Sequence, residues 1–96
     1  MDFTEEVLGL VERIPPGRVM SYGAIAACLG SGGPRQVGTV MARYGGGVPW
    51  HRVVTASGRT PPGHEARALG LLRAEGTPLR GEYVDMPRAA WYPSAD

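Results

Sequence analysis

The chain has 96 residues, 43% hydrophobic and 20% charged, a balance typical of one compact globular domain and not of a disordered chain. It has no apolar stretch long enough to span a membrane, and its acidic N-terminus lacks the pattern of a signal peptide, so we expect a cytoplasmic protein. A single cysteine, Cys28, excludes an internal disulfide and a cysteine-based metal site, and we expect no metal or cofactor.

The net charge is only +1, but the charges are distributed unevenly along the chain. All ten basic residues are arginines, and the segment from Arg13 to His64 contains six of them and no acidic residue. A composition rich in Ala and Gly accounts for the choice of arginine over lysine. The segregation of the charges, in contrast, favours a polyanionic partner.

Three helices are predicted in the first half of the chain, over residues 3–14, 22–29 and 34–44, where apolar residues recur at helical spacing. The local signals that bound them are Asp2 or Thr4, Ser21 and Pro34 at the starts, and Pro15-Pro16-Gly17, Gly30 and Gly45-Gly46-Gly47 at the ends. The second and third helices are joined by a tight glycine-rich turn. With exposed Arg35, Gln36, Thr39 and Arg43 on the third helix, this pair predicts a helix-turn-helix.

The second half of the chain predicts a short strand over residues 52–55, a turn at Ser57-Gly58 and a fourth helix over residues 64–75. The strand and turn favour a small β wing. The predicted fold is therefore mostly α, a winged-helix-like helical domain with a helix-turn-helix and a short β wing. We expect one domain over residues 1–96, with a core over 3–76 and a tail over 77–96 in which the aromatic side chains are buried.

Several separated motifs occur in an order that is much more specific than any one of them. They are Ile14-Pro15-Pro16-Gly17-Arg18-Val19, Ser21-Tyr22-Gly23, Arg35-Gln36-Val37-Gly38, Pro49-Trp50-His51-Arg52-Val53 and Ala74-Glu75-Gly76. Together they resemble the DNA-binding domain of the O6-alkylguanine-DNA alkyltransferases, from about Phe3 to Gly76.

One departure from the enzymes decides what the resemblance implies. Their pentapeptide carries the cysteine that accepts the alkyl group, and Trp50 stands in its place here. Alkyl transfer needs a thiolate nucleophile, which an indole does not offer, although His51 and Glu75 match the residues that activate the cysteine. The tryptophan variant resembles the alkyltransferase-like proteins, and so do the tail segments over residues 81–87 and 91–93. These bind alkylated guanine without repairing it and help nucleotide excision repair find the lesion.

The resemblance implies a non-enzymatic protein whose partners are double-stranded DNA containing O6-alkylguanine and nucleotide excision repair proteins. It places the third helix in the minor groove, with Arg35 filling the gap left by a rotated nucleotide, Tyr22 pressing on its phosphate and Gly38 allowing close approach. Arg52 is expected to tie loops together. The implied DNA-binding residues are Tyr22, Arg35, Gln36, Gly38, Thr39 and Arg43, and the implied lesion-pocket residues are Tyr22, Trp50, His51, Val53 and Arg59.

Two other functions are compatible with parts of the sequence. A sequence-specific winged-helix regulator would use Gln36 and Arg43 to read base edges in the major groove, but such regulators are usually dimers. The chain has no evident dimerisation helix, so we expect a monomer. A residual alkyltransferase would need Cys28 or another side chain as the acceptor, and we expect the small Cys28 side chain to be buried on its Ala-rich helix.

Overall fold

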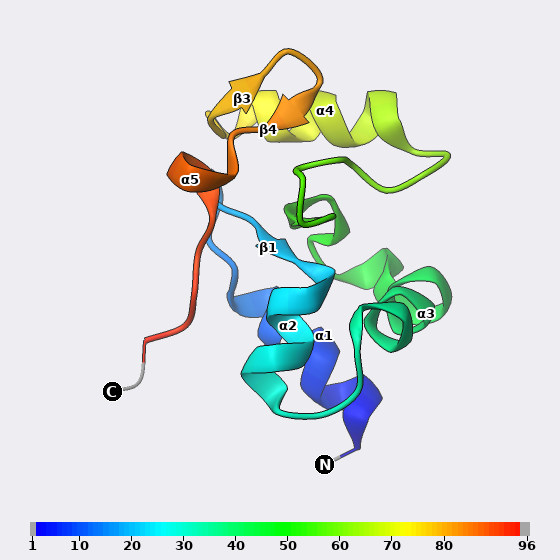
Figure 1. Cartoon of the computed structure of the whole chain (residues 1–96). Helices are drawn as coiled ribbons and strands as arrows, with labels where there is room; N and C mark the ends of the chain where they lie inside the picture. Colours follow the sequence, from blue (N-terminus) through cyan, green and yellow to red (C-terminus); the bar gives the residue numbers. More distant parts are fainter. Residues whose placement is uncertain (1, 95–96) are drawn as a thin grey trace.

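Helices dominate the structure and form two groups on either side of a short central sheet (Figure 1). The computed structural model describes residues 2–94. Its helices are α1 (Phe3–Arg13), α2 (Tyr22–Leu29), α3 (Pro34–Tyr44), α4 (Glu65–Ala74) and α5 (Met86–Ala89), with short 3-10 helices η1 (Gly45–Gly47) and η2 (Trp50–Arg52). Its strands are β1 (Met20–Ser21), β2 (Val53–Val54), β3 (Leu79–Arg80) and β4 (Tyr83–Val84).

The first three helices begin and end where the local signals predict. The carboxylate of Asp2 accepts a hydrogen bond from the Glu5 amide at 2.8 Å, and the hydroxyl of Ser21 accepts one from the Ala24 amide at 3.0 Å. Each satisfies an amide that the first turn of a helix leaves unpaired. Gly30 ends α2 in the left-handed conformation, at a φ of 68°, and Pro34 occupies the first position of α3. These predictions are confirmed.

The strand predicted over residues 52–55 is present but shorter, because Arg52 belongs to η2. It pairs in parallel with β1, Met20 opposite Val53 and Ser21 opposite Val54, and so does not form a wing hairpin with the residues that follow it. Parallel strands need a long crossover, which α2 and α3 provide here. The antiparallel hairpin of the molecule is β3–β4, in the tail.

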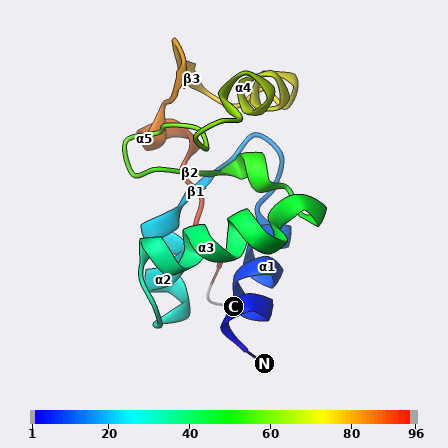
Figure 2. The same ribbon diagram turned by 90° about the vertical axis from the view of Figure 1, so that its right-hand side faces the viewer.

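Successive residues of this small sheet point into two different hydrophobic clusters. Met20 and Val53 pack with α1, α2 and α3, whereas their neighbours Val19 and Val54 pack with residues of α4 and the tail. This alternation is what an extended backbone imposes, and both faces of a parallel sheet are usually covered. Figure 2 shows α3 on one side of β1 and β2, and α4 with β3 on the other.

The loop after β2 is fixed to the tail at Gly58, which has a φ of 88°. The amide of Val84 donates a hydrogen bond to the Gly58 carbonyl at 2.8 Å, and a Cβ at Gly58 would collide with the Val84 carbonyl oxygen. Further along, Arg18 donates hydrogen bonds to the carbonyls of Ala89 and Ala90 at 3.1 and 2.6 Å. The tail is thereby held against both ends of the sheet.

Two expectations about burial are wrong. Cys28 is exposed, because α2 buries only its Ile25 and Ala26 against the neighbouring helices. In the tail, Trp91 is half-buried against the cluster of α1–α3, but Tyr92 is 66% exposed. Among residues 2–94, no helix has the length and apolar character required to cross a membrane.

Candidate nucleic-acid interface

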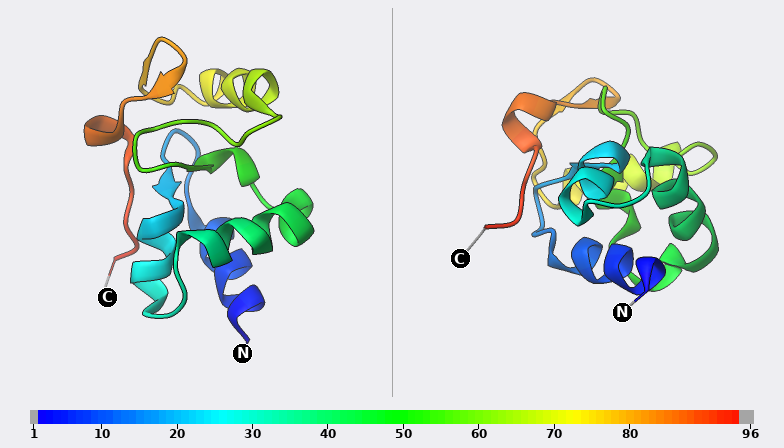
Figure 3. Two further views of the ribbon diagram at one scale, coloured as in Figure 1. Left: turned by 45° about the vertical axis from the view of Figure 1, so that its right-hand side comes forward. Right: turned by 60° about the horizontal axis from the view of Figure 1, so that its bottom comes forward.

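A cavity of about 910 Å³ separates α3 from the loop that joins β2 to α4. That loop passes opposite α3 in the left view of Figure 3. The volume lies within the range of small-molecule sites, about 300–1,000 Å³. None of the described residues that line it is acidic. They are Tyr22, Gly23, Pro34, Arg35, Gly38, Met41, Ala42, Gly45, Gly46, Trp50, Thr55, Ala56, Pro61, Pro62, His64 and Arg67.

The wall formed by α2 and α3 carries three of the predicted DNA-binding residues. Arg35 is exposed and makes no ion pair with a carboxylate of residues 2–94. One turn later, Gly38 leaves open space, since a Cβ built there meets no atom within 4 Å. Burial raises the pKa of the half-buried Tyr22, so its phenol stays protonated at neutral pH and can donate a hydrogen bond to an anion.

The other predicted DNA-binding residues do not line the cavity. The side-chain oxygen of Gln36 accepts a hydrogen bond from the Gly33 amide at 2.9 Å, and the Thr39 hydroxyl donates one to the Arg35 carbonyl at 3.1 Å. Both side chains therefore make hydrogen bonds to the backbone of α3 or of its N-cap. Arg43 is exposed in the last turn of α3.

Trp50 forms the opposite wall, where the half-buried indole has three neighbours. The ring of His51 lies 5.9 Å from the indole centroid at 85°, and that of His64 lies 5.7 Å away at 63°, both in edge-to-face geometry. The guanidinium carbon of Arg67 lies 5.8 Å from the same centroid, within cation–π range. An apolar ring is thus presented to the cavity with cationic or polar groups around it.

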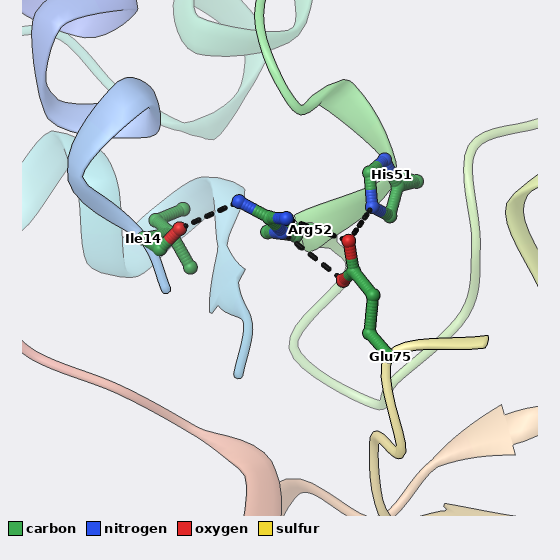
Figure 4. Close-up of polar contacts among 4 residues, drawn as sticks. All are labelled: Ile14, His51, Arg52 and Glu75. Carbon is green, nitrogen blue, oxygen red and sulfur yellow. Dashed lines mark hydrogen bonds and ion pairs between the residues drawn. The ribbon is translucent and has the colours of Figure 1, made fainter. Parts of the chain in front are cut away.

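A network of polar and charged side chains fixes the backbone that follows Trp50 (Figure 4). Arg52 donates two hydrogen bonds to the Glu75 carboxylate, from Nε at 3.0 Å and from Nη2 at 2.6 Å, and a third to the Ile14 carbonyl at 2.9 Å. His51 Nε2 lies 3.0 Å from Glu75 Oε2. Arg52 therefore joins η2, the end of α1 and the end of α4, which is the tying role expected from the sequence.

Glu75 is held as an anion in this network. The Arg52 hydrogen bonds are the largest influence and, with His51, they lower the Glu75 pKa from 4.5 to about 2, against the opposing effect of burial. Its side chain is 18% exposed, and those of Arg52 and His51 are 14% and 9% exposed. The network is thus largely shielded from solvent.

Of the predicted lesion-pocket residues, Tyr22 and Trp50 line the cavity, from opposite walls. His51 lies behind Trp50 and contacts Glu75, and Val53 is fully buried in the core. Arg59 points elsewhere, with its guanidinium carbon 5.7 Å from the centroid of the Tyr83 ring. Neither these three residues nor any others in residues 2–94 form a group of three or more ligands that could hold a metal ion.

Sequence reasoning missed the two basic side chains beside Trp50. His64 precedes α4, and Arg67 lies in its first turn, where a positive charge opposes the helix dipole. Arg35 has the same kind of position in the first turn of α3. Arginines at such positions are the signal that could have indicated Arg67, whose guanidinium lies over the Trp50 ring.

Comparisons with known proteins agree with this geometry. Residues 2–77 match the family model described as the DNA binding domain of 6-O-methylguanine DNA methyltransferase. The DNA base-flipping protein of Escherichia coli is 38% identical over 96 residues, covering 93% of this chain and 74% of that protein. Alkyltransferase-like protein 1 of Schizosaccharomyces pombe is 35% identical, covering 96% of each chain. The crystal structure of S. pombe Atl1 with damaged DNA containing O6-carboxymethylguanine superposes with a TM-score of 0.81 and 31% identity, covering 95% of each chain.

Proposed function

This chain belongs to the family of the 6-O-methylguanine DNA methyltransferase DNA-binding domain, among its alkyltransferase-like members. On that premise we propose that it binds O6-alkylguanine in duplex DNA, holds the lesion nucleotide outside the helix and transfers no alkyl group. The observation that carries the proposal is the cavity itself. It lies beside α2 and α3, is lined by Trp50, and has two arginines but no acidic residue among its described lining residues.

The binding step uses α3 in the minor groove. Rotating a nucleotide out of the duplex costs a few kcal/mol of stacking and pairing, and less for a damaged base. Arg35 can offset part of that cost, because a planar cation inserted into the base stack restores contacts and meets phosphate charge. Its exposure, and the absence of any ion pair for it within residues 2–94, support this role. The Tyr22 hydroxyl donates a hydrogen bond to the phosphate of the rotated nucleotide. Gly38, which has no side chain, lets the sugar–phosphate backbone of the DNA approach α3 closely.

The lesion base then lies against Trp50. Its indole contributes apolar contact to the base and to the alkyl substituent, but offers no nucleophile that could capture the alkyl group. His51 does not supply one either, since its Nε2 contacts Glu75. Cys28 is exposed at the end of α2 and does not line the cavity. Binding is therefore reversible, and the protein leaves the lesion unchanged.

A reversible complex that holds a damaged nucleotide outside the duplex marks its position for other proteins. We propose that the nucleotide excision repair machinery reads this mark. Purified excision nuclease should cut an O6-alkylguanine duplex faster in the presence of this protein. An unchanged incision rate would remove the proposed partner and leave lesion binding in place.

Lesion binding is tested by titrating the protein into duplexes that differ only in carrying guanine or O6-methylguanine, at matched salt. We expect at least about tenfold tighter binding of the lesion duplex, whatever the flanking sequence, because each tenfold needs only about 1.4 kcal/mol. The mass of the protein should be unchanged after incubation. Equal affinities would overturn lesion binding, affinity set by the flanking sequence would favour a regulator, and a mass gain of one methyl group would favour an active transferase.

A further inference from the structure

The loop between β2 and α4, residues 55–64, forms a wall of the cavity opposite α3 and belongs to none of the helices and strands. Its residues that line the cavity are Thr55, Ala56, Pro61, Pro62 and His64. The position of this loop therefore decides how closely a flipped nucleotide is enclosed. Lesion binding depends accordingly on the contacts that hold the loop in place.

The first half of the loop is a turn closed by its own hydrogen bonds. The Thr55 amide donates to the Arg59 carbonyl at 2.9 Å, and the Gly58 amide donates to the Thr55 carbonyl at 2.9 Å. The Thr55 hydroxyl oxygen also accepts a hydrogen bond from the Arg59 amide at 2.9 Å. Pro61 and Pro62 follow shortly after, and their rings fix their φ angles. The position of the turn therefore largely sets the position of the two prolines on the cavity wall.

Two contacts attach this turn to the β3–β4 hairpin of the tail. The Val84 amide donates a hydrogen bond to the Gly58 carbonyl at 2.8 Å. Beside it, the guanidinium carbon of Arg59 lies 5.7 Å from the centroid of the Tyr83 ring, within cation–π range. Arg59 is exposed and Tyr83 is 47% exposed. The contact between these two side chains can therefore be removed by substitution without opening the hydrophobic core.

We propose that the β3–β4 hairpin holds the loop in the position that encloses a flipped nucleotide, with Tyr83 as a positioning residue that acts through Arg59. This inference rests on the proposed lesion binding and gives the tail a part in it. A loop that is held in place before DNA arrives loses little conformational entropy on binding, whereas a loosened loop must be ordered at the expense of affinity. An undamaged duplex, whose bases stay stacked, does not occupy the cavity and does not depend on the loop.

The experiment measures the affinity and dissociation rate of Tyr83→Leu and Tyr83→Phe on duplexes that carry guanine or O6-methylguanine at one position, at matched salt. Leucine keeps an apolar side chain but removes the aromatic face. We expect Tyr83→Leu to bind the lesion duplex about threefold to fivefold more weakly, through faster dissociation, as suits an exposed cation–π contact. Its affinity for the undamaged duplex and its salt dependence should be unchanged. Tyr83→Phe should keep the wild-type affinity, because a phenyl ring still faces the guanidinium.

Arg59→Gln removes the other side of the same contact and should weaken lesion binding by the same factor. The double variant Tyr83→Leu/Arg59→Gln should bind no more weakly than either single variant, because both substitutions remove one contact. Arg80→Gln is the matched control for charge. Arg80 is an exposed arginine of the hairpin whose Nε lies 3.3 Å from the Asp85 carboxylate, and this variant should keep the wild-type affinity for both duplexes.

Wild-type lesion affinity in Tyr83→Leu would overturn the positioning role, and so would an equal loss on both duplexes. A loss in Tyr83→Phe as large as that in Tyr83→Leu would overturn the action of the ring on Arg59. If Arg59→Gln weakened both duplexes equally with a shallower salt dependence, Arg59 would be a phosphate contact and its link to Tyr83 would be overturned. The preference of the wild-type protein for O6-methylguanine over guanine tests lesion binding separately.

Discussion

Two arginines of the same acid-free segment have opposite situations in the fold. Arg52 is largely buried and donates three hydrogen bonds, two of them to Glu75. Arg35 is exposed on the cavity wall, where the described lining residues include no carboxylate. The sequence around each is equally basic, so local charge does not separate them. What separates them is a carboxylate brought from the distant end of α4, and the difference assigns one arginine to stability and the other to an external anion.

The two sites also depend on each other, because Trp50 stands between them. On one side, the network of His51, Arg52 and Glu75 fixes the backbone of η2, to which Trp50 belongs. On the other side, the Trp50 indole lines the cavity. The network thus holds the indole in a fixed position on the cavity wall. Substitutions in the two sites should accordingly separate into losses of stability and losses of DNA affinity.

The largest expected effect is on stability and comes from Arg52→Ala. This change removes three hydrogen bonds and leaves the Glu75 carboxylate, 18% exposed, with His51 as its remaining partner. Breaking a buried pair from one side typically costs about 3–5 kcal/mol, and we expect about 3 kcal/mol here by urea unfolding. Arg73→Ala, at an exposed position, should stay within about 0.5 kcal/mol of wild type. A loss below about 1 kcal/mol for Arg52→Ala would contradict the structural role.

Arg35→Ala should do the reverse. With no ion pair inside residues 2–94 to lose, its unfolding free energy should remain within about 0.5 kcal/mol of wild type. Affinity for an O6-methylguanine duplex should fall about a hundredfold, or about 2.7 kcal/mol, because the gap in the base stack is no longer filled. Fluorescence anisotropy at constant salt measures this change. Unchanged affinity would remove the insertion of Arg35 from the binding step.

Acid should weaken the paired site by a predictable amount. The pKa of Glu75 is lowered to about 2 in the folded protein. The ionised carboxylate therefore stabilises the folded state at pH values above 4.5, the ordinary pKa of a glutamate. That contribution is lost as the pH falls from about 4.5 towards about 2. Between pH 5 and pH 3 the expected loss is about 2 kcal/mol of unfolding free energy. Glu75→Gln should remove this part of the pH dependence, whereas Glu12→Gln, at an exposed position of α1, should keep it. Parallel pH profiles for both variants would show that Glu75 is not the group responsible.

Local signals predicted much of the fold, and residues brought together from distant parts of the chain were harder to place. Asp2, Ser21, Gly30 and Pro34 act within a few residues of themselves, so the helix ends were correct. The pairing of β1 with β2, in contrast, depends on two short strands far apart in the sequence. Local patterning indicates the extended segments but not the strands with which they pair, which is why the segment over residues 52–55 was expected to belong to a small β wing.

The candidate site shows the same division. The family resemblance implied Tyr22, Arg35, Gly38 and Trp50, and these four line one cavity. It did not indicate Arg67, because the fold of the loop between β2 and α4 decides that its side chain reaches Trp50. Likewise, the Cys28 side chain was expected to be buried because it is small and lies on an Ala-rich helix. The packing of α2, which buries Ile25 and Ala26, leaves it exposed.

The smallest expected effect concerns glycine positions, where a substitution can separate DNA affinity from stability. Gly38 in α3 is half-buried and Gly9 in α1 is exposed, and at both a new Cβ meets no atom within 4 Å. Alanine should therefore raise the unfolding free energy of either variant by about 0.5–1 kcal/mol, because it restricts the unfolded chain more than glycine does. Only Gly38 lines the cavity, so only Gly38→Ala should weaken lesion binding, by about fivefold, or about 1 kcal/mol. Thermal unfolding and the same anisotropy titration measure both quantities. If the two variants bound DNA equally well, the DNA backbone would not occupy the open space at Gly38, and the close approach would be contradicted.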